Sequence, residues 1–89
     1  MNDMEITEAC GDMRVYLQAY FDARDDYPGI IGVTYDPSRD VYNFHLNATR
    51  IGSHSASEIP SEEMELNDFL TPIAETASTL ARFSHNGTN

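Results

Sequence analysis

The feature of this sequence that most constrains its fold is the alternation in residues 41–47, VYNFHLN. Tyr42, Phe44 and Leu46 are apolar and occupy every second position, while the residues between them are polar. A period of two is typical of an extended strand with one buried and one exposed face. Such patterning is common in antiparallel sheets, because one face packs on the core and the other meets water. The stretch therefore predicts an antiparallel strand, and the rest of the chain must supply its neighbours and a cover.

The flanking segments predict those neighbours. Residues 29–35, GIIGVTY, are rich in β-branched residues, and the following DPSRD has turn chemistry, with Asp36 placed to bond the backbone ahead of it. These features predict a hairpin with residues 41–47. A third strand over Thr49–Ser53, after a tight connection at Asn47-Ala48, is a weaker expectation, and the serine-rich stretch after it is interpreted as a loop. The sheet thus has two or three strands.

Helical spacing appears at both ends of the chain. Between Ile6 and Phe21 the apolar residues recur at three- and four-residue intervals, which predicts a helix that ends near Arg24. Asn2 can cap this helix, although Gly11 leaves a later start at Asp12 open. A second apolar stripe runs from Leu66 to Ala81 and is interrupted by Pro72. Either Thr71 caps a helix that begins at Pro72, or one helix from about Ser61 or Asn67 is kinked there.

Together these elements predict a small α+β fold in the order α-β-β-(β)-α. The length of 89 residues fits one domain, residues 1–89, with residues 1–4 and 85–89 expected to be frayed. Two helices can cover the apolar face of a two- or three-stranded antiparallel sheet.

The charge balance excludes several classes of partner. The formal net charge is −10, and all five basic residues are arginines. An acidic surface repels phosphate, so we expect no direct binding of nucleic acid or of an anionic membrane. The acidity has three explanations: a solubilising surface, adaptation to high salt, or a binding surface for a basic partner. The N-terminal residues have neither the basic segment nor the apolar segment of a signal peptide, so we expect a cytoplasmic protein.

No motif points to catalysis, a cofactor or a metal. His45, His54 and His85 lack metal-ligand spacing, and the single cysteine, Cys10, lies on the apolar stripe of the first predicted helix. The serines and glycines form no nucleophile elbow and no phosphate-binding loop. We therefore expect a protein that is not an enzyme and that needs no cofactor.

The carboxylates form two dense groups. Three of them, Asp22, Asp25 and Asp26, lie at the end of the first predicted helix, where acids are unfavourable to the helix dipole. Five others precede or begin the second predicted helix, namely Glu58, Glu62, Glu63, Glu65 and Asp68. Acids at a helix N-terminus are favourable, but that explains two or three of the five. We interpret both groups as candidate residues for partner binding.

Carboxylates along a rigid surface can imitate backbone phosphates, so the lysines and arginines of a nucleic-acid-binding protein would accept them. Small acidic inhibitors encoded by phages and mobile elements act in this way against CRISPR, restriction and repair machinery. This chain is similar to that class in size, acidity and lack of motifs, though not in sequence. The sequence therefore predicts an inhibitor or regulator of a basic nucleic-acid-binding protein, active in the host cytoplasm if phage-encoded. The alternatives are a structural or assembly subunit, a small homodimeric accessory protein, or an antitoxin or immunity protein.

Overall fold

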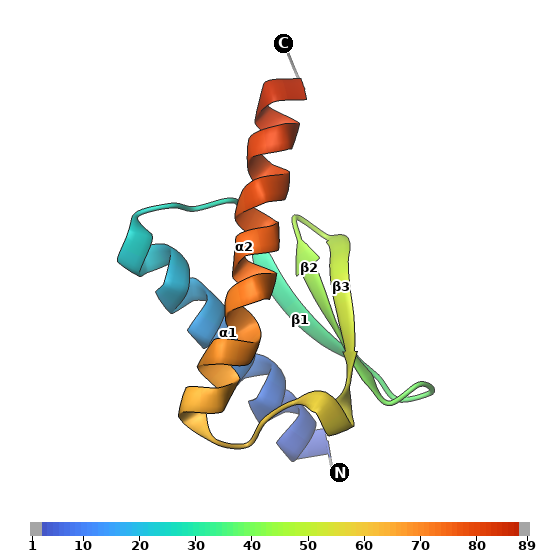
Figure 1. Ribbon diagram of the computed structural model, residues 1–89. Coiled ribbons are helices and arrows are strands. Elements are labelled where there is room, and N and C mark those ends of the chain that lie inside the picture. Colours follow the sequence, from blue (N-terminus) through green and yellow to red (C-terminus); the bar gives the residue numbers. More distant parts are fainter. Residues whose placement is uncertain (1–2, 88–89) are drawn as a thin grey trace.

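The computed structural model describes residues 3–87, with side chains as far as Phe83. Over these residues the chain forms two helices, a three-stranded sheet and one turn of 3-10 helix (Figure 1). In chain order these are α1 (Asp3–Arg24), β1 (Ile31–Asp36), β2 (Val41–Leu46), β3 (Thr49–Ser55), η1 (Ala56–Glu58) and α2 (Glu63–Gly87). The predicted α+β class and the α-β-β-β-α order are confirmed, and the third strand exists.

The sheet is an antiparallel meander with the strand order β1-β2-β3. Asp36 Oδ1 accepts hydrogen bonds from the backbone N–H of Ser38 at 3.0 Å and from its hydroxyl at 2.7 Å, as expected for the turn between β1 and β2. The connection from β2 to β3 consists of Asn47 and Ala48, both with positive φ. Two residues with positive φ match the right-handed twist of a hairpin. β3 continues two residues beyond the predicted end, to Ser55.

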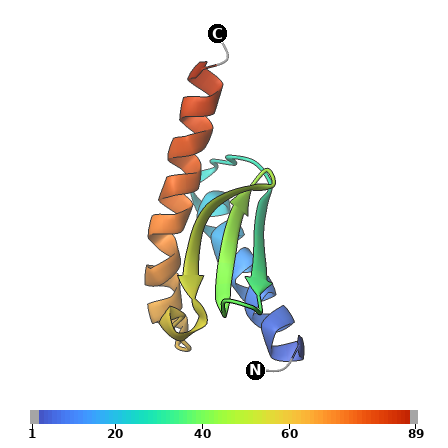
Figure 2. The same cartoon turned by 90° about the vertical axis from the view of Figure 1, so that its right-hand side faces the viewer.

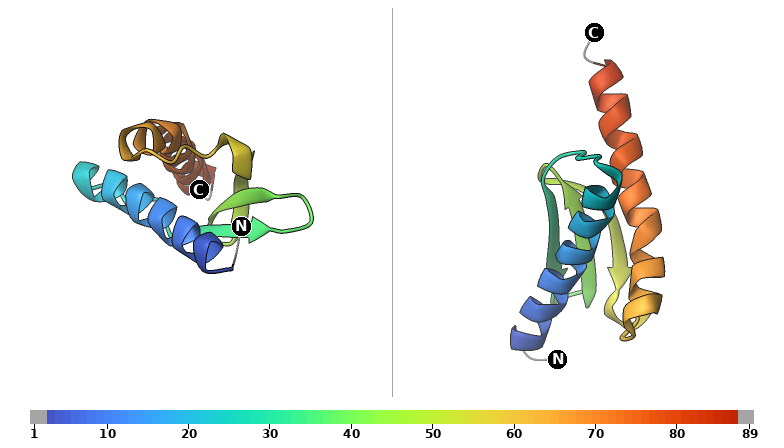
Figure 3. Two further views of the ribbon diagram at one scale, coloured as in Figure 1. Left: turned by 90° about the horizontal axis from the view of Figure 1, so that it is seen from below. Right: turned by 90° about the vertical axis from the view of Figure 1, so that its left-hand side faces the viewer.

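The apolar residues that alternate along β2 form the centre of the hydrophobic core. Tyr42, Phe44 and Leu46 are all buried, and Phe44 is fully so. They pack against the buried residues of α1, Met13, Leu17 and Phe21, which are spaced four apart along one side of that helix. Seen from below, both helices lie on the same side of the sheet (Figure 3), as the sequence predicts.

Helix α1 passes through Gly11 and begins at Asp3, so the later start at Asp12 is wrong. The expected cap, Asn2, lies outside the described residues. Of the residues that were expected to be frayed, Met4 belongs to α1 and residues 85–87 belong to α2. Neither helix, over the part of the chain that the structure describes, is long and apolar enough to cross a membrane.

Helix α2 is one helix that continues through Pro72, so a helix beginning at Pro72 is wrong. Proline cannot donate the hydrogen bond that would reach the carbonyl of Asp68. Because Pro72 and Asp68 are both exposed, water can satisfy that carbonyl. The stripe on the opposite side buries Leu70, Ile73 and neighbouring alanines against the core. Tertiary packing therefore outweighs the local cost of the proline.

Candidate functional site

The two acidic groups predicted from the sequence lie at different ends of helix α2. The Asp26 carboxylate is 3.9 Å from the guanidinium of Arg82, so the end of α1 lies beside the C-terminal half of α2. Glu65 is in the first turn of α2. At 1.5 Å per residue, the positions of Glu65 and Arg82 are about 25 Å apart along the helix. The structure therefore does not bring the two groups together into one surface.

The acids that follow α1 form the end of that helix. Asp25 has a φ of 51°, in the left-handed region, and its N–H donates to the carbonyl of Asp22. The N–H of Asp26 donates to the carbonyl of Phe21 at 3.1 Å. This pair of bonds is the Schellman ending, in which the left-handed residue is usually glycine but aspartate is tolerated. Asp25 is thus explained by backbone geometry.

The other two carboxylates of this group also have partners inside the molecule. Gln18 Nε2 donates to Asp22 Oδ1 at 3.4 Å, and a hydrogen bond to Asp22 is the main cause of the raised pKa of Tyr27. Asp26 forms its ion pair with Arg82. Neither contact could be predicted from the sequence, because each depends on where the loop after α1 turns. We therefore interpret these three acids as the ending of a helix and as weaker candidates for partner binding.

Glu58 likewise has a local role. Its Oε1 accepts the backbone N–H of Ser55 at 2.9 Å, and together they form the capping box of η1. This backbone bond is the largest cause of the lowered pKa of Glu58, and the neighbouring His54 lowers it further. His54 Nδ1 lies 3.6 Å from Glu58 Oε2. The pair of His54 and Glu58 was not predicted from the sequence, although its spacing of four residues could have indicated it.

His54 also contacts two aromatic rings. Its ring centroid is 5.9 Å from that of Phe44 and 4.9 Å from that of Phe69, both in edge arrangements. The prediction that the serine-rich segment is a loop is therefore wrong for residues 54–55, which belong to β3, and for 56–58, which form η1. His54 packs over the core instead of standing free on a loop.

The remaining acids lie at the start of α2 and divide by the side of the helix they occupy. Glu63 faces α1, where its carboxylate accepts a hydrogen bond from the hydroxyl of Tyr16. The pKa of Tyr16 is raised first by burial and then by Glu63 and Asp12. By contrast, the structure gives the carboxylates of Glu62, Glu65 and Asp68 no hydrogen bond or ion pair with any described residue. All three are exposed.

These unpaired carboxylates lie beside an exposed methionine. Met64 is 82% exposed, although a residue of this kind is usually packed. At 100° per residue, Met64, Asp68 and Glu65 fall within an arc of about 100° around the helix axis, and Glu62 directly precedes the helix. We call these four residues the acidic α2 surface. They combine negative charge with an apolar contact on a rigid helix.

The other side chains considered for chemistry have structural roles. Burial raises the pKa of Cys10, which makes its thiol less reactive. His45 Nε2 lies 3.0 Å from Thr34 Oγ1, on the sheet face opposite the helices. His85 lies beyond the last described side chain. Among the described residues, no group of three or more histidine, cysteine, aspartate or glutamate side chains is placed to hold a metal ion.

Comparison with known protein families, curated proteins and solved structures gives no match for this chain.

Proposed function

We propose that this protein is a non-enzymatic binding module that docks its acidic α2 surface on a basic, nucleic-acid-binding protein. One observation carries the proposal. Glu62, Glu65 and Asp68 have no partner within the described chain and lie beside the exposed Met64.

The arrangement suits a partner that normally binds phosphates. Residues three apart on a helix are separated by about 4.5 Å along its axis, comparable with the 3.4 Å axial spacing of phosphates in one DNA strand. A helix also holds its carboxylates in fixed relative positions, so little backbone order is lost on binding. Met64 adds an apolar contact that a nucleic acid backbone does not offer, which favours the protein over the nucleic acid in competition.

The consequence for the partner is inhibition or regulation. A protein that occupies the basic groove of a nucleic-acid-binding enzyme excludes its substrate, and no chemistry is required of the inhibitor. The small size, the net charge of −10 and the absence of a catalytic motif support this role. They fit the phage- and mobile-element-encoded inhibitors of CRISPR and restriction systems, acting in the host cytoplasm.

The test is an affinity capture from nuclease-treated host lysate with three forms of the protein as bait. These are the wild type, the triple variant Glu62→Lys, Glu65→Lys and Asp68→Lys, and a control triple variant Asp3→Lys, Glu8→Lys and Glu75→Lys. The two variants change the net charge equally, and all six residues are exposed, five of them on helices and Glu62 directly before α2. Each variant removes one acid from the first turn of a helix, Asp3 in the control and Glu65 in the α2 variant, and the α2 variant also removes Glu62 directly before α2.

We expect the wild type and the control variant to retain the same nucleic-acid-binding protein at low salt and to release it at high salt. The α2 variant should retain none of it, because like charges facing each other in an interface cost several kcal/mol. Equal retention by all three forms would contradict the proposal. Equal loss in both variants would show that only the total charge matters, and would also contradict it.

A further inference from the structure

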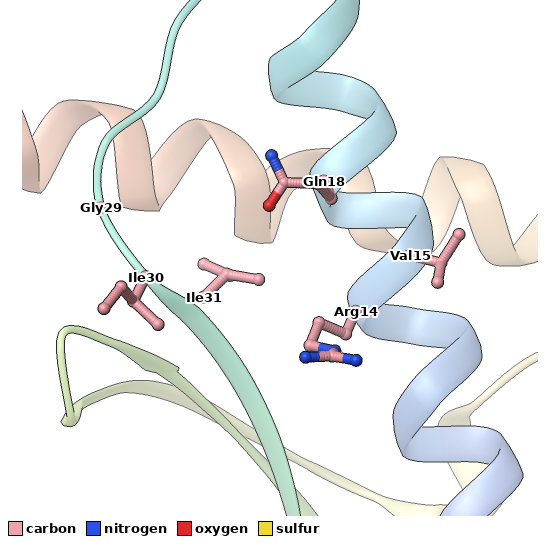
Figure 4. A pocket seen from close by; sticks show the side chains of 6 residues that line it. All are labelled: Arg14, Val15, Gln18, Gly29, Ile30 and Ile31. Atoms are coloured by element: carbon pink, nitrogen blue, oxygen red, sulfur yellow. The ribbon is translucent and has the colours of Figure 1, made fainter.

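Two pairs of exposed apolar side chains stand out on the described surface. Val15 and Ile30 lie at a hollow of about 360 Å³ between α1 and the start of β1, but Figure 4 shows them on opposite sides of it, so they form no continuous patch. Leu80 and Phe83 are 43% and 70% exposed and are three residues apart on α2. Figure 2 shows the C-terminal part of α2 extending beyond the end of the sheet. Leu80 and Phe83 therefore reach solvent from a part of the helix that the sheet does not cover.

These two side chains continue a stripe along the outer side of α2. Pro72, Thr76, Leu80 and Phe83 are all exposed, and at 100° per residue they fall within an arc of about 80°. Proline has no N–H, and Thr76 Oγ1 donates to the carbonyl of Pro72 at 2.9 Å, so the threonine hydroxyl is already bonded within the helix. The side that these four residues present to solvent is therefore largely apolar. We call them the α2 stripe.

The charges beside the α2 stripe are few and balanced. Residues 69–87 include one acid, Glu75, and one arginine, Arg82, although the net charge of the chain is −10. Each of the two directly precedes a member of the stripe, so both lie about 100° to the same side of it. Glu75 forms no ion pair with a described residue, and Arg82 is 75% exposed at its 3.9 Å contact with Asp26. Two copies can therefore meet along this stretch without the repulsion between their other acids.

We propose that the α2 stripe is a dimerisation surface and that its occupant is the α2 stripe of a second copy, packed antiparallel about a two-fold axis midway between Glu75 and Arg82. Such an axis keeps a residue on its flank of the helix pair and exchanges the two levels, so each Glu75 comes opposite Arg82 of the second copy. Arg82 then lies between Asp26 of its own chain and Glu75 of the other. A guanidinium has five N–H donors and can bond both acids.

The apolar side chains fit the same register. Phe83 comes level with position 74 of the second copy, midway between its Pro72 and Thr76. Two smaller side chains at these positions leave room for an aromatic ring, as in the packing of knobs into holes between helices. Leu80 lies on the flank opposite the charges, about 4.5 Å along the axis from Leu80 of the second copy. Burial of Phe83 and Leu80 from water supplies the driving force.

The test measures dimerisation by sedimentation over a wide range of protein concentration. Glu75→Arg and Arg82→Glu each place like charges opposite each other, and the double variant Glu75→Arg, Arg82→Glu restores the pairs with the order reversed. Arg50→Glu on β3 is the control, because it changes the net charge as Arg82→Glu does. All three residues are exposed, so the variants should fold, as circular dichroism can verify.

We expect a wild-type dimer and little change with Arg50→Glu. Each single reversal of Glu75 or Arg82 should raise the dissociation constant at least about tenfold, because the two-fold axis repeats every like-charge contact. The double variant should return to within about threefold of the wild type, because coupling between two residues in contact survives when both change together. Phe83→Ala should weaken the dimer at least about tenfold through the lost apolar contact.

Three results would overturn the inference. One is a monomer at every concentration. Another is a double variant that stays as weak as the two single variants, which would show that Glu75 and Arg82 do not meet. The third is a dimer that keeps its affinity in Phe83→Ala and in both single reversals, as pairing through the open edge of β1 would give.

The dimer and the proposed function are tested separately. Sedimentation uses the purified protein alone, and Glu75, Arg82 and Phe83 do not belong to the acidic α2 surface. In the dimer, Glu65 of one copy is about 40 Å along the helix pair from Glu65 of the other, so both acidic surfaces stay free at its ends. The control bait with Glu75→Lys should therefore lose the dimer and still retain a basic partner. Either claim can fail while the other holds.

Discussion

The acids that end α1 and the acids that begin α2 look alike in the sequence but behave differently in the structure. Asp22, Asp25 and Asp26 cap, bond or pair with neighbours inside the molecule. Glu62, Glu65 and Asp68 contact no partner in the part of the chain that the structure describes. Acidity alone therefore says little about function. What distinguishes the two groups is whether local stereochemistry already uses each carboxylate.

The structure also changes the interpretation of the acids at the end of α1. Acids at a helix C-terminus oppose the helix dipole, which suggested a use in partner binding. The left-handed backbone of Asp25 and the bonds of Asp22 and Asp26 supply a structural use instead. At the start of α2 the dipole favours acids, but from the sequence it explained only two or three of the five. Their exposure around Met64 makes them the stronger candidates.

The largest expected effect is on binding by the acidic α2 surface. With the captured partner in purified form, the triple reversal of Glu62, Glu65 and Asp68 to lysine should weaken affinity at least about 100-fold. The loss of Glu65 from the first turn of α2, and of Glu62 directly before it, should cost about 1–2 kcal/mol of folding stability. Titration calorimetry and chemical denaturation measure the two effects separately. A loss of affinity below about threefold would contradict the assignment of these residues.

The second prediction concerns Asp25, which is held in a left-handed conformation. Asp25→Gly should stabilise the protein by about 0.5–1 kcal/mol, because glycine adopts this conformation without strain. Partner affinity should stay the same. Urea denaturation and calorimetry test both parts. Reduced affinity together with increased stability would show that the Asp25 carboxylate belongs to a binding surface after all.

A smaller effect is expected for the Asp26–Arg82 ion pair. Its side chains are 41% and 75% exposed and its closest atoms are 3.9 Å apart. Exposed pairs contribute about 0–1 kcal/mol, so Asp26→Asn should reduce stability by about 0.5 kcal/mol or less. The difference should vanish at high salt, where surface charges are screened. A difference that persists in high salt would assign the effect to something other than the ion pair.

The smallest effect concerns the pH dependence of Glu58, whose pKa is lowered chiefly by the backbone N–H of Ser55. A lowered pKa in the folded state contributes stability above the ordinary value of 4.5, and that contribution is lost as pH falls through the lowered value. Glu58→Gln keeps an acceptor oxygen but no charge. Thermal unfolding should find the variant slightly less stable than the wild type near neutral pH and equal to it in strong acid.

Most of the fold followed from the sequence because it depends on periodic apolar residues. The alternation of Tyr42, Phe44 and Leu46 identified the central strand and its buried face. The course of α2 through Pro72 did not follow, because local chemistry left a helix start and a kink equally open. Packing of Leu70 and Ile73 against the sheet decides between them, and packing is a long-range property.

The candidate site was predictable only as a list of acids. Sequence spacing placed Glu62, Glu65 and Asp68 near a helix start, but it gave no means of telling them from Glu63, which faces Tyr16. The contact depends on how α1 crosses α2. The exposure of Met64 was equally hidden, since a methionine among acids fits either side of a helix.

Amide hydrogen exchange of the protein, free and bound to the captured partner, tests the contrast between the two acidic groups most directly. The account predicts slower exchange in the bound state over residues 62–70, at the start of α2. It predicts no change over residues 20–27, where the first acidic group ends α1. Protection centred on residues 20–27, or on the sheet with none at the start of α2, would contradict it.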